Sequence, residues 1–427
     1  MTDVWHIVTR RDFLRRAWRW GVAAGGAGVA VSSPAWLKWL GWRDGGKAHA
    51  ATSAGELARL APRARFWVAA NQDGARCLEC HLPSAAECHN PDTGELLTEH
   101  RHSSAYVKCL LCAKTCLIPD GERGACRARM NVGGEMRSLV YGRPIAIHID
   151  PIEKKPFYHF LPGSAAYSIA TAGCPLHCKF CQNWELSQSA PEDHPDGYAP
   201  PETIVAGAES ARAPVIAFTY NEPTVFTEYL LDIAARGKVS GLRSVLISCG
   251  FMTEEPLAEM CQTLDAIKID LKGFSGDFYN KVCSADLQPV LRSIKQAARS
   301  GVHLEIVNLV VPTLNDSDRM MRGLVEWVMG EVGPDVPVHF TRFHPDYQMM
   351  NLPPTPVATL EKARDLAMER GIRYAFVGNV PGHPGNNTYC PSCHKPVIKR
   401  SNFFITESNM KDGKCGHCGA SIAGVWS

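Results

Sequence analysis

The stretch of sequence that decides the fold of this chain is SIATAGCPLHCKFCQNW, residues 168–184. It starts with a short apolar run, Ser168–Ala172, which predicts a buried strand, and continues into a loop that carries Cys174, Cys178 and Cys181. Three thiolates at this spacing can ligate three irons of a cubane cluster and leave the fourth iron open to a chelating substrate. A structural zinc site would need a fourth ligand and closure. The stretch therefore predicts a [4Fe–4S] cluster at the carboxyl end of a strand.

Beyond this stretch, short apolar runs alternate with helical stretches up to about Val380. The further strands that we expect are Val215–Thr219, Ser244–Ser248, Ala266–Leu271, Leu304–Val311, Val336–Phe343 and Tyr374–Val377, and the expected helices include Pro223–Ala235, Pro289–Ala298 and Val357–Met368. Such alternation predicts an α/β fold with a parallel sheet and covering helices. A closed eight-unit barrel needs about 250 residues. The alternating stretch is shorter, so we expect an open, partial β/α barrel.

The composition limits the function classes. The chain has 427 residues, of which 45% are hydrophobic and 21% charged, and this favours a globular protein of two or three domains. A net charge of +2 gives no field for binding nucleic acid. No apolar run reaches the roughly 18 residues of a membrane-spanning helix. We therefore expect neither a nucleic-acid partner nor a stable membrane span.

The 17 cysteines are the unusual feature of the composition. Most of them fall in tight clusters, which suits thiolates converging on metals better than a disulfide framework. Cys390, Cys393, Cys415 and Cys418 have the layout of a zinc ribbon, with a rubredoxin-type iron site as the alternative. Cys109, Cys112, Cys116 and Cys126 can close a second site, for zinc or for a second iron–sulfur cluster. Cys77, Cys80 and Cys88 form either a third metal site or an unoccupied remnant.

Several residues at strand ends resemble the radical SAM superfamily once they are taken together with the cysteine loop. The pair Glu222-Pro223 follows the second strand, Asp270-Leu271-Lys272 ends the fourth, and Phe343-His344 ends the sixth. In that family the open iron binds the amino and carboxylate groups of S-adenosylmethionine (SAM), and one electron splits SAM into methionine and a 5′-deoxyadenosyl radical. The glycines that usually precede Glu-Pro are replaced here by Tyr220 and Asn221.

The resemblance implies a set of cofactor-binding residues. Phe180 would lie beside the adenine, Glu222 would bind the methionine ammonium, and Asp270 with Lys272 would line the SAM pocket, as in the glycyl-radical-enzyme activases. His344 would lie near the ribose and adenine. The remaining residues that we assign to cofactor binding are Gln182, Asn183 and Asn308.

A closer resemblance covers roughly residues 105–427. Its motifs are the Cys109–Cys126 segment, Asp150–Pro156, Phe160–Ser164 and Gly378–Gly382. In this order they resemble the AmmeMemoRadiSam-system radical SAM enzymes, relatives of the pyruvate formate-lyase activating enzyme. The resemblance implies hydrogen abstraction from a peptide or small molecule, with a glycyl-radical-enzyme activase as the alternative. It also implies a low-potential electron donor of flavodoxin or ferredoxin type, and partner proteins of the same system.

The N-terminus indicates a different cellular context. Arg10-Arg11 with Phe13-Leu14, a weak apolar stretch and Ala48-His49-Ala50 are similar to a twin-arginine (Tat) export signal, with a basic amphipathic extension as the alternative. SAM and low-potential electrons favour the cytoplasm, so location stays open between cytoplasm and periplasm. Because Cys77-Leu78-Glu79-Cys80-His81 matches a haem attachment motif, an exported haem or metal-binding electron-transfer protein is a distant alternative.

The expected organisation has four parts. They are a Tat-like segment at 1–50, a Cys-rich N-terminal cap at 51–164, the radical SAM core at 165–385 and a zinc-ribbon-like module at 386–427.

Overall fold

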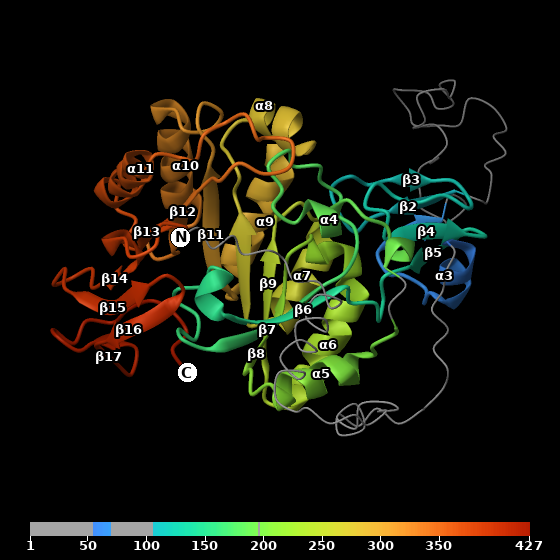
Figure 1. The fold of residues 1–427 in the computed structure, drawn as a ribbon, viewed down its shortest axis with the longest axis horizontal. Helices are drawn as coiled ribbons and strands as arrows, with labels where there is room; N and C mark the ends of the chain where they lie inside the picture. Colours follow the sequence, from blue (N-terminus) through green and yellow to red (C-terminus); the bar gives the residue numbers. More distant parts are fainter. Residues whose placement is uncertain (1–53, 70–105, 195–196) are drawn as a thin grey trace, which may run out of the picture.

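The apolar runs that follow residue 164 assemble into one large sheet in the computed structural model, which describes residues 54–69, 106–194 and 197–427 (Figure 1). The strand order is β13-β12-β11-β10-β9-β8-β7-β6. Strands β7 to β13 pair in parallel, and β6 pairs antiparallel with β7. The bounds are β6 Ala146–Pro151, β7 Ala165–Ala170, β8 Val215–Phe218, β9 Arg243–Ser248, β10 Ala266–Asp270, β11 His303–Val310, β12 Val338–Arg342 and β13 Ala375–Gly378.

The two edge strands β6 and β13 do not pair with each other, so backbone hydrogen bonds leave this sheet open. All seven expected strands are present within a few residues of their expected bounds. The predicted α/β fold with a large, mainly parallel sheet is therefore confirmed. Strand β6 was not expected: its two isoleucines, Ile147 and Ile149, are exposed instead of marking a buried strand.

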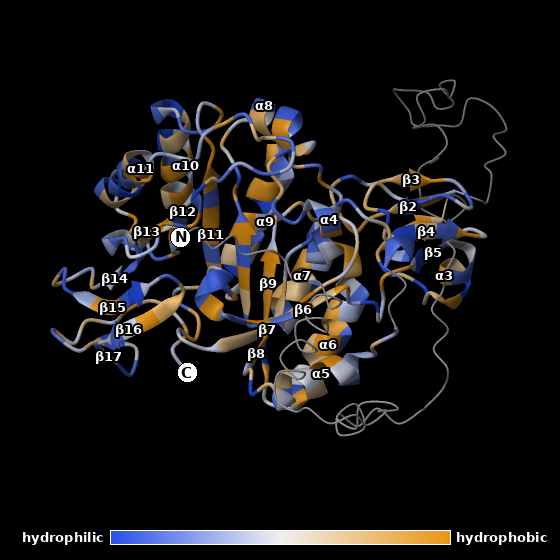
Figure 2. Ribbon diagram, viewed as in Figure 1, coloured by the Kyte–Doolittle hydropathy of each residue, from blue (hydrophilic) through white to orange (hydrophobic). Residues whose placement is uncertain are grey.

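Helices alternate with the parallel strands and cover the sheet from outside (Figure 1). The longer ones are α5 Pro201–Ser210, α6 Thr227–Val239, α7 Glu254–Thr263, α9 Leu287–Ser300, α10 Asp318–Glu331 and α11 Val357–Glu369. Shorter turns are η3 Ile152–Lys154, α4 Trp184–Ser187, η4 Pro191–Asp193, η5 Pro223–Phe226, α8 Gly276–Phe278, the π-helical η6 Tyr279–Cys283 and η7 Pro384–Asn386. Figure 2 shows that central strands such as β9 are mostly hydrophobic, as burial under helices requires.

An N-terminal lobe lies beside the sheet and consists of α3 and five short strands (Figure 1). Their bounds are α3 Ala54–Leu60, β1 Trp67–Ala69, β2 Val107–Cys109, β3 Leu117–Ile118, β4 Arg129–Val132 and β5 Glu135–Ser138. The lobe contacts the loop that follows β9: Cys112 forms a β-bridge with Met252, and the Ala113 N–H donates to Phe251 O at 3.2 Å. It therefore meets the carboxyl end of the sheet.

The C-terminal segment forms a second small unit on the opposite side of the sheet in Figure 1. Its strands are β14 Thr388–Tyr389, β15 Pro396–Ser401, β16 Phe404–Ser408, β17 Met410–Lys411 and β18 Lys414–Cys415. The unit packs through an aromatic cluster that includes Tyr158 and Phe376. Buried Arg400 lies 3.7 Å from the Glu153 carboxylate and donates to Tyr158 O at 2.7 Å. A buried ion pair with its hydrogen bonds thus attaches this unit to the main sheet.

Candidate active site

The loop after β7 carries Cys174, Cys178 and Cys181, the cysteine triad, at the carboxyl edge of the sheet. Neighbouring elements hold this loop from two sides. Asn221 Nδ2, after β8, donates to Gly173 O at 2.8 Å, and the His177 N–H donates to Cys283 O of η6 at 3.1 Å. Parallel sheets place their chemistry at this edge, because the loops that follow the strands meet there.

The triad sulfur atoms are spread out. Three or more ligand atoms of His, Cys, Asp or Glu that lie within 4.8 Å of one another could hold a metal ion. Among the residues that the structure describes, only a C-terminal set meets this criterion, and the triad does not. A cubane cluster requires wide spacing, because each cysteine binds a different iron. The residues present therefore fit a [4Fe–4S] cluster better than a single ion.

Gly173 determines how closely the triad loop approaches the N-terminal lobe. Its φ is +93°, and a Cβ at this position would lie 2.2 Å from the backbone oxygen of Cys126. Such a distance is impossible for a carbon, so only glycine permits this contact. The triad loop and the Cys109–Cys126 segment are consequently in direct backbone contact.

The charges around the triad act in opposite directions on its thiols. Burial raises the pKa of Cys174, and Glu222 raises it further. A hydrogen bond with Cys283 lowers the pKa of Cys178; burial opposes it, and Lys272 adds a smaller lowering effect. Since thiolates and not thiols ligate iron, Lys272 favours the ionised form that a cluster needs.

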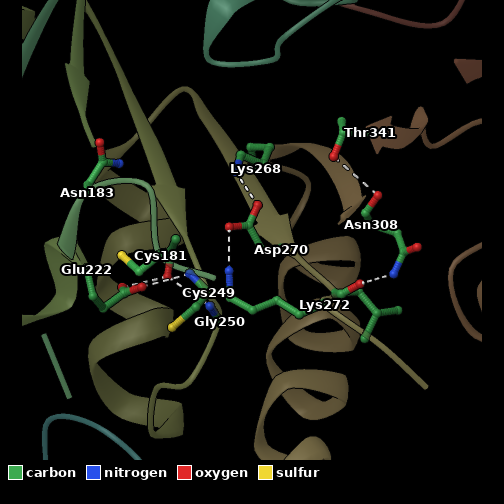
Figure 3. Close-up of polar contacts among 12 residues, drawn as sticks. Cys181, Asn183, Glu222, Cys249, Gly250, Lys268, Asp270, Lys272, Asn308 and Thr341 are labelled. Carbon is green, nitrogen blue, oxygen red and sulfur yellow. Dashed lines mark hydrogen bonds and ion pairs between the residues drawn. The ribbon is translucent and has the colours of Figure 1, made fainter. Parts of the chain in front are cut away.

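Glu222 begins η5 and is almost fully buried. Its Oε1 accepts hydrogen bonds from the Thr224 N–H at 3.2 Å, the Thr224 hydroxyl at 2.5 Å and the Ser248 hydroxyl at 2.7 Å. Its Oε2 accepts one from the Cys249 N–H at 2.7 Å (Figure 3). A carboxylate offers about four lone-pair sites. The carboxylate therefore joins the ends of β8 and β9, and these four donors match its acceptor capacity.

A row of charges runs along β10 into the loop beyond it (Figure 3). Residues two apart on a strand share a face, and Lys268, Asp270 and Lys272 continue this spacing. The Asp270 carboxylate pairs with Lys268 Nζ and, at 3.0 Å, with Lys272 Nζ. Burial raises the pKa of Asp270, but the two lysines outweigh it and lower the pKa to about 2. Lys268 was not among the predicted site residues, although its spacing from Asp270 was a usable signal.

Two of the other predicted cofactor residues face this row. Asn308 on β11 donates from Nδ2 to Leu271 O at 2.8 Å, and its buried Oδ1 has no partner in the described part of the chain. Phe180 is buried, stacks against Phe278 with ring centroids 6.4 Å apart, and lies 5.8 Å from Lys272 Nζ. Asn308 therefore has spare acceptor capacity, whereas Phe180 is packed among protein groups.

The remaining predicted residues make other contacts or are exposed. Asn183 donates from Nδ2 to Tyr220 O at 2.9 Å, and Gln182 is exposed. His344 is exposed, with Nδ1 3.0 Å from Pro345 O. Asn183 thus supports the unusual backbone at Tyr220, whose φ is +71°.

A second polar cluster was not predicted as part of the site. Tyr220 donates to the Asp150 carboxylate, whose Oδ2 also pairs with Lys155 Nζ at 2.5 Å. Lys155 Nζ lies 4.3 Å from the Tyr220 ring centroid. Burial lowers the pKa of Lys155 to about 8, although Asp150 opposes this, and Lys268 adds a small lowering effect. The Asp150–Pro156 segment, prominent in the sequence as a motif, thus places two charged groups close to the β10 row.

The two other predicted cysteine sites differ in geometry. Cys390 Sγ lies 3.6 Å from Cys418 Sγ, and Cys393 Sγ lies 3.8 Å from Cys415 Sγ. All four of these sulfur atoms lie within 4.8 Å of one another, so the C-terminal set could hold one metal ion. Cys109, Cys112, Cys116 and Cys126 also come together, in the N-terminal lobe, but their sulfurs do not form such a close set.

Two predictions lie outside the described residues: the Tat-like segment at 1–50 and the group Cys77, Cys80 and Cys88. No helix in the described ranges combines the length and hydropathy that a membrane crossing needs.

Comparisons with known proteins found one family model, a curated relative and several solved structures that resemble this chain. The family model of the radical SAM superfamily matches residues 168–324. An uncharacterized protein of Methanocaldococcus jannaschii is 42% identical over 318 residues, which cover 74% of this chain and 95% of that protein. Among solved structures, a domain of a pyruvate-formate lyase-activating enzyme from Bacteroides vulgatus matches 38% of this chain and 98% of its own, with 16% identity and a TM-score of 0.35. Streptococcus suis SuiB bound to S-adenosylmethionine matches 59% of this chain and 56% of its own, with 10% identity and a TM-score of 0.42.

Proposed function

The chain belongs to the radical SAM superfamily and is an enzyme, and we propose that it cleaves SAM reductively to abstract a hydrogen atom from a peptide or small-molecule substrate. The observation that carries this proposal is the position of the cysteine triad. Its three thiols lie at the carboxyl edge of the sheet, beside Glu222 and Lys272, with sulfur spacing too wide for one ion.

Family membership implies a [4Fe–4S] cluster, SAM and an electron donor. When bound, the cluster and SAM supply one-electron cleavage to methionine and a 5′-deoxyadenosyl radical, which takes one hydrogen atom from the substrate. The triad would ligate three irons, and the fourth would stay open for the amino and carboxylate groups of SAM. We assign the electron donor to the flavodoxin or ferredoxin type.

The groups around the triad provide polar contacts for SAM and substrate. The buried Asn308 Oδ1 needs a donor, and an N–H or O–H of either ligand would satisfy it. The negative charge of the buried Glu222 carboxylate suits the methionine ammonium. Lys155, Lys268 and Lys272 outnumber Asp150 and Asp270 in the two polar clusters. This charge balance favours a substrate that carries a negative group.

The C-terminal cysteine set supports a structural zinc site in the proposed ribbon. A Zn–S bond of about 2.3 Å in tetrahedral geometry separates neighbouring sulfurs by about 3.8 Å, close to the 3.6 and 3.8 Å found here. The backbone N–H groups of Ser392 and His417 donate to Cys390 Sγ and Cys415 Sγ, as thiolate ligands need. The partner proteins and a cytoplasmic location, with Tat export as the alternative, remain parts of this proposal.

The proposed chemistry is tested by replacing each triad cysteine with alanine. After anaerobic reconstitution, wild type reduced with dithionite should release 5′-deoxyadenosine and methionine from SAM, and each variant should release none. Cys261→Ala is the matched control, because Cys261 is buried on α7 outside the cysteine clusters. Circular dichroism and zinc content check that the variants fold. SAM cleavage by the triple variant at the wild-type rate would disprove the proposal.

The substrate class is tested with deuterated candidates. Deuterium that moves from a peptide or small molecule into 5′-deoxyadenosine identifies the substrate. A stable glycyl radical formed on a partner enzyme would instead establish the activase alternative.

A further inference from the structure

Four cysteines of the N-terminal lobe face one another from different elements. Cys109 ends β2, Cys112 and Cys116 lie between β2 and β3, and Cys126 precedes β4. Each thiol is met by a backbone amide. The N–H groups of residues 111, 114 and 128 act on Cys109, Cys112 and Cys126, and that of residue 125 donates to Cys116 Sγ at 3.5 Å. Amides directed at sulfur are the usual environment of metal-bound thiolates.

The spacing of these sulfurs differs from that of the C-terminal set. In the described part of the chain, no three of them lie mutually within 4.8 Å. One tetrahedral zinc would require sulfurs about 3.8 Å apart. A [2Fe–2S] cluster takes two cysteines on each iron, and its two irons per chain would distinguish it from a cubane. The wider arrangement fits a cubane, in which every cysteine binds its own iron.

Arg129 gives an independent indication of a negatively charged ligand. Its side chain is 1% exposed, and its Nε and Nη1 have no hydrogen-bond partner among the described residues. The remaining nitrogen, Nη2, lies 3.0 Å from Glu228 Oε1 and donates to the backbone oxygen of Arg65. The guanidinium acts electrostatically on Cys109, Cys112 and Cys126. Unpaired buried donors cost free energy, and a cluster held by four thiolates supplies the missing negative charge.

We propose that Cys109, Cys112, Cys116 and Cys126 bind a second [4Fe–4S] cluster that passes electrons to the cluster of the triad. All four irons would have a protein ligand, so none is open to a substrate. This closure excludes substrate anchoring through iron and favours electron transfer. Contact between Cys126 O and the Gly173 position places the second cluster next to the triad loop.

The electron balance of the relay is one electron per turnover. A flavodoxin or ferredoxin reduces the second cluster from the 2+ to the 1+ state. That cluster returns to 2+ as it reduces the triad cluster from 2+ to 1+, and SAM cleavage consumes the electron. The relay rests on the proposed function, whereas the presence of the second cluster does not.

Metal content tests the second cluster without any activity. Reconstituted wild type should hold about eight irons per chain, and the triad variant Cys174→Ala/Cys178→Ala/Cys181→Ala about four, with Mössbauer parameters of a four-cysteine [4Fe–4S]²⁺ cluster. Cys112→Ala/Cys126→Ala in the triad variant should abolish that remaining iron, and Cys261→Ala should leave it. Zinc should stay at one per chain throughout. If the triad variant held two zincs and no iron, or only two irons, the proposal of a second [4Fe–4S] cluster would be wrong. This measurement needs no substitution in the N-terminal lobe.

The choice of reductant tests the relay. In Cys112→Ala/Cys126→Ala with an intact triad, reduced flavodoxin should no longer support SAM cleavage, whereas dithionite, a small molecule, should still do so. Equal loss with both reductants, while the triad cluster keeps its iron and its EPR response to SAM, would refute the relay. If wild-type protein did not cleave SAM with dithionite, the proposed function would be wrong, whereas the metal content would still test the second cluster.

Discussion

Replacing Glu222 with glutamine should destabilise the protein, although the change adds no bulk and removes a single charge. Both carboxylate oxygens accept hydrogen bonds, and two of the donors, the Thr224 and Cys249 N–H groups, belong to the backbone. Hydroxyl groups such as that of Ser248 can rotate and become acceptors, but backbone N–H groups cannot.

The magnitude follows from which donor loses its partner. If the glutamine NH₂ occupies the Oε1 position, the Thr224 N–H is left without an acceptor. If it occupies the Oε2 position, the Cys249 N–H is left without one. Leaving one buried donor unsatisfied costs about 1–3 kcal/mol. The surviving bonds weaken as well, because charge-assisted hydrogen bonds are stronger than neutral ones. We therefore expect a loss of at least about 1–3 kcal/mol in the free energy of unfolding.

Urea unfolding of the zinc-loaded protein, prepared without iron, measures this loss without interference from the cluster. Glu255→Gln is the control, since Glu255 is exposed on α7 and should change stability by less than about 0.5 kcal/mol. Ser248→Ala should fall between the two, because it removes one of four donors. SAM binding to reconstituted protein then reports separately on the charge that Glu222 offers to the methionine ammonium. An unchanged unfolding midpoint for Glu222→Gln would refute the hydrogen-bond reasoning.

Three further outcomes follow from the same structure. Asp270→Asn should cost about 3–5 kcal/mol in urea unfolding, because it leaves the buried Lys268 ammonium without its counter-charge. Gly173→Ala should abolish iron binding at the triad, as measured by iron analysis, whereas Gly241→Ala, with similar positive φ but no neighbour within 4 Å, should only lower stability slightly. As the pH is lowered from 6.5 to about 3, His159 should reduce the free energy of unfolding by up to about 1.4 kcal/mol per pH unit. Burial lowers the pKa of His159 in the folded protein to about 3, so in this range the unfolded chain binds a proton that the folded protein does not. His159→Gln should flatten this part of the pH profile.

The fold could be predicted from the sequence where burial dominates. Strands β7 to β13 are apolar because helices cover them, and β8 is buried along its whole length. Strand β6 escaped prediction because it lies at an edge and exposes Ile147 and Ile149, so that its pattern does not differ from that of an irregular segment. A hydrophobic pattern indicates which residues are buried, whereas β6 is held in the sheet by its backbone pairing with β7.

The candidate site was predictable only where the spacing along the chain carries the chemistry. The triad is such a case, since its three cysteines lie within one loop. Lys155 could not be placed, because its contact with Tyr220 joins residues 65 apart in the sequence. Glu222 shows the opposite difficulty: its position was foreseen, but four internal hydrogen-bond donors give its carboxylate a structural role that no motif reveals.

The distinction between zinc and iron–sulfur sites is where three dimensions add most. Both remaining cysteine sets begin with two cysteines separated by two residues and each supplies four thiolates, so the sequence leaves the metal open for both. Sulfur spacing separates them: close pairs at the C-terminus suit one ion, and the wider set in the N-terminal lobe suits a cluster. Their surroundings agree with this division. The C-terminal set packs against the aromatic cluster that includes Tyr158 and Phe376, and one of its members, Cys418, is exposed. The N-terminal set is mostly buried, has Arg129 beside it and touches the loop where the electron is needed.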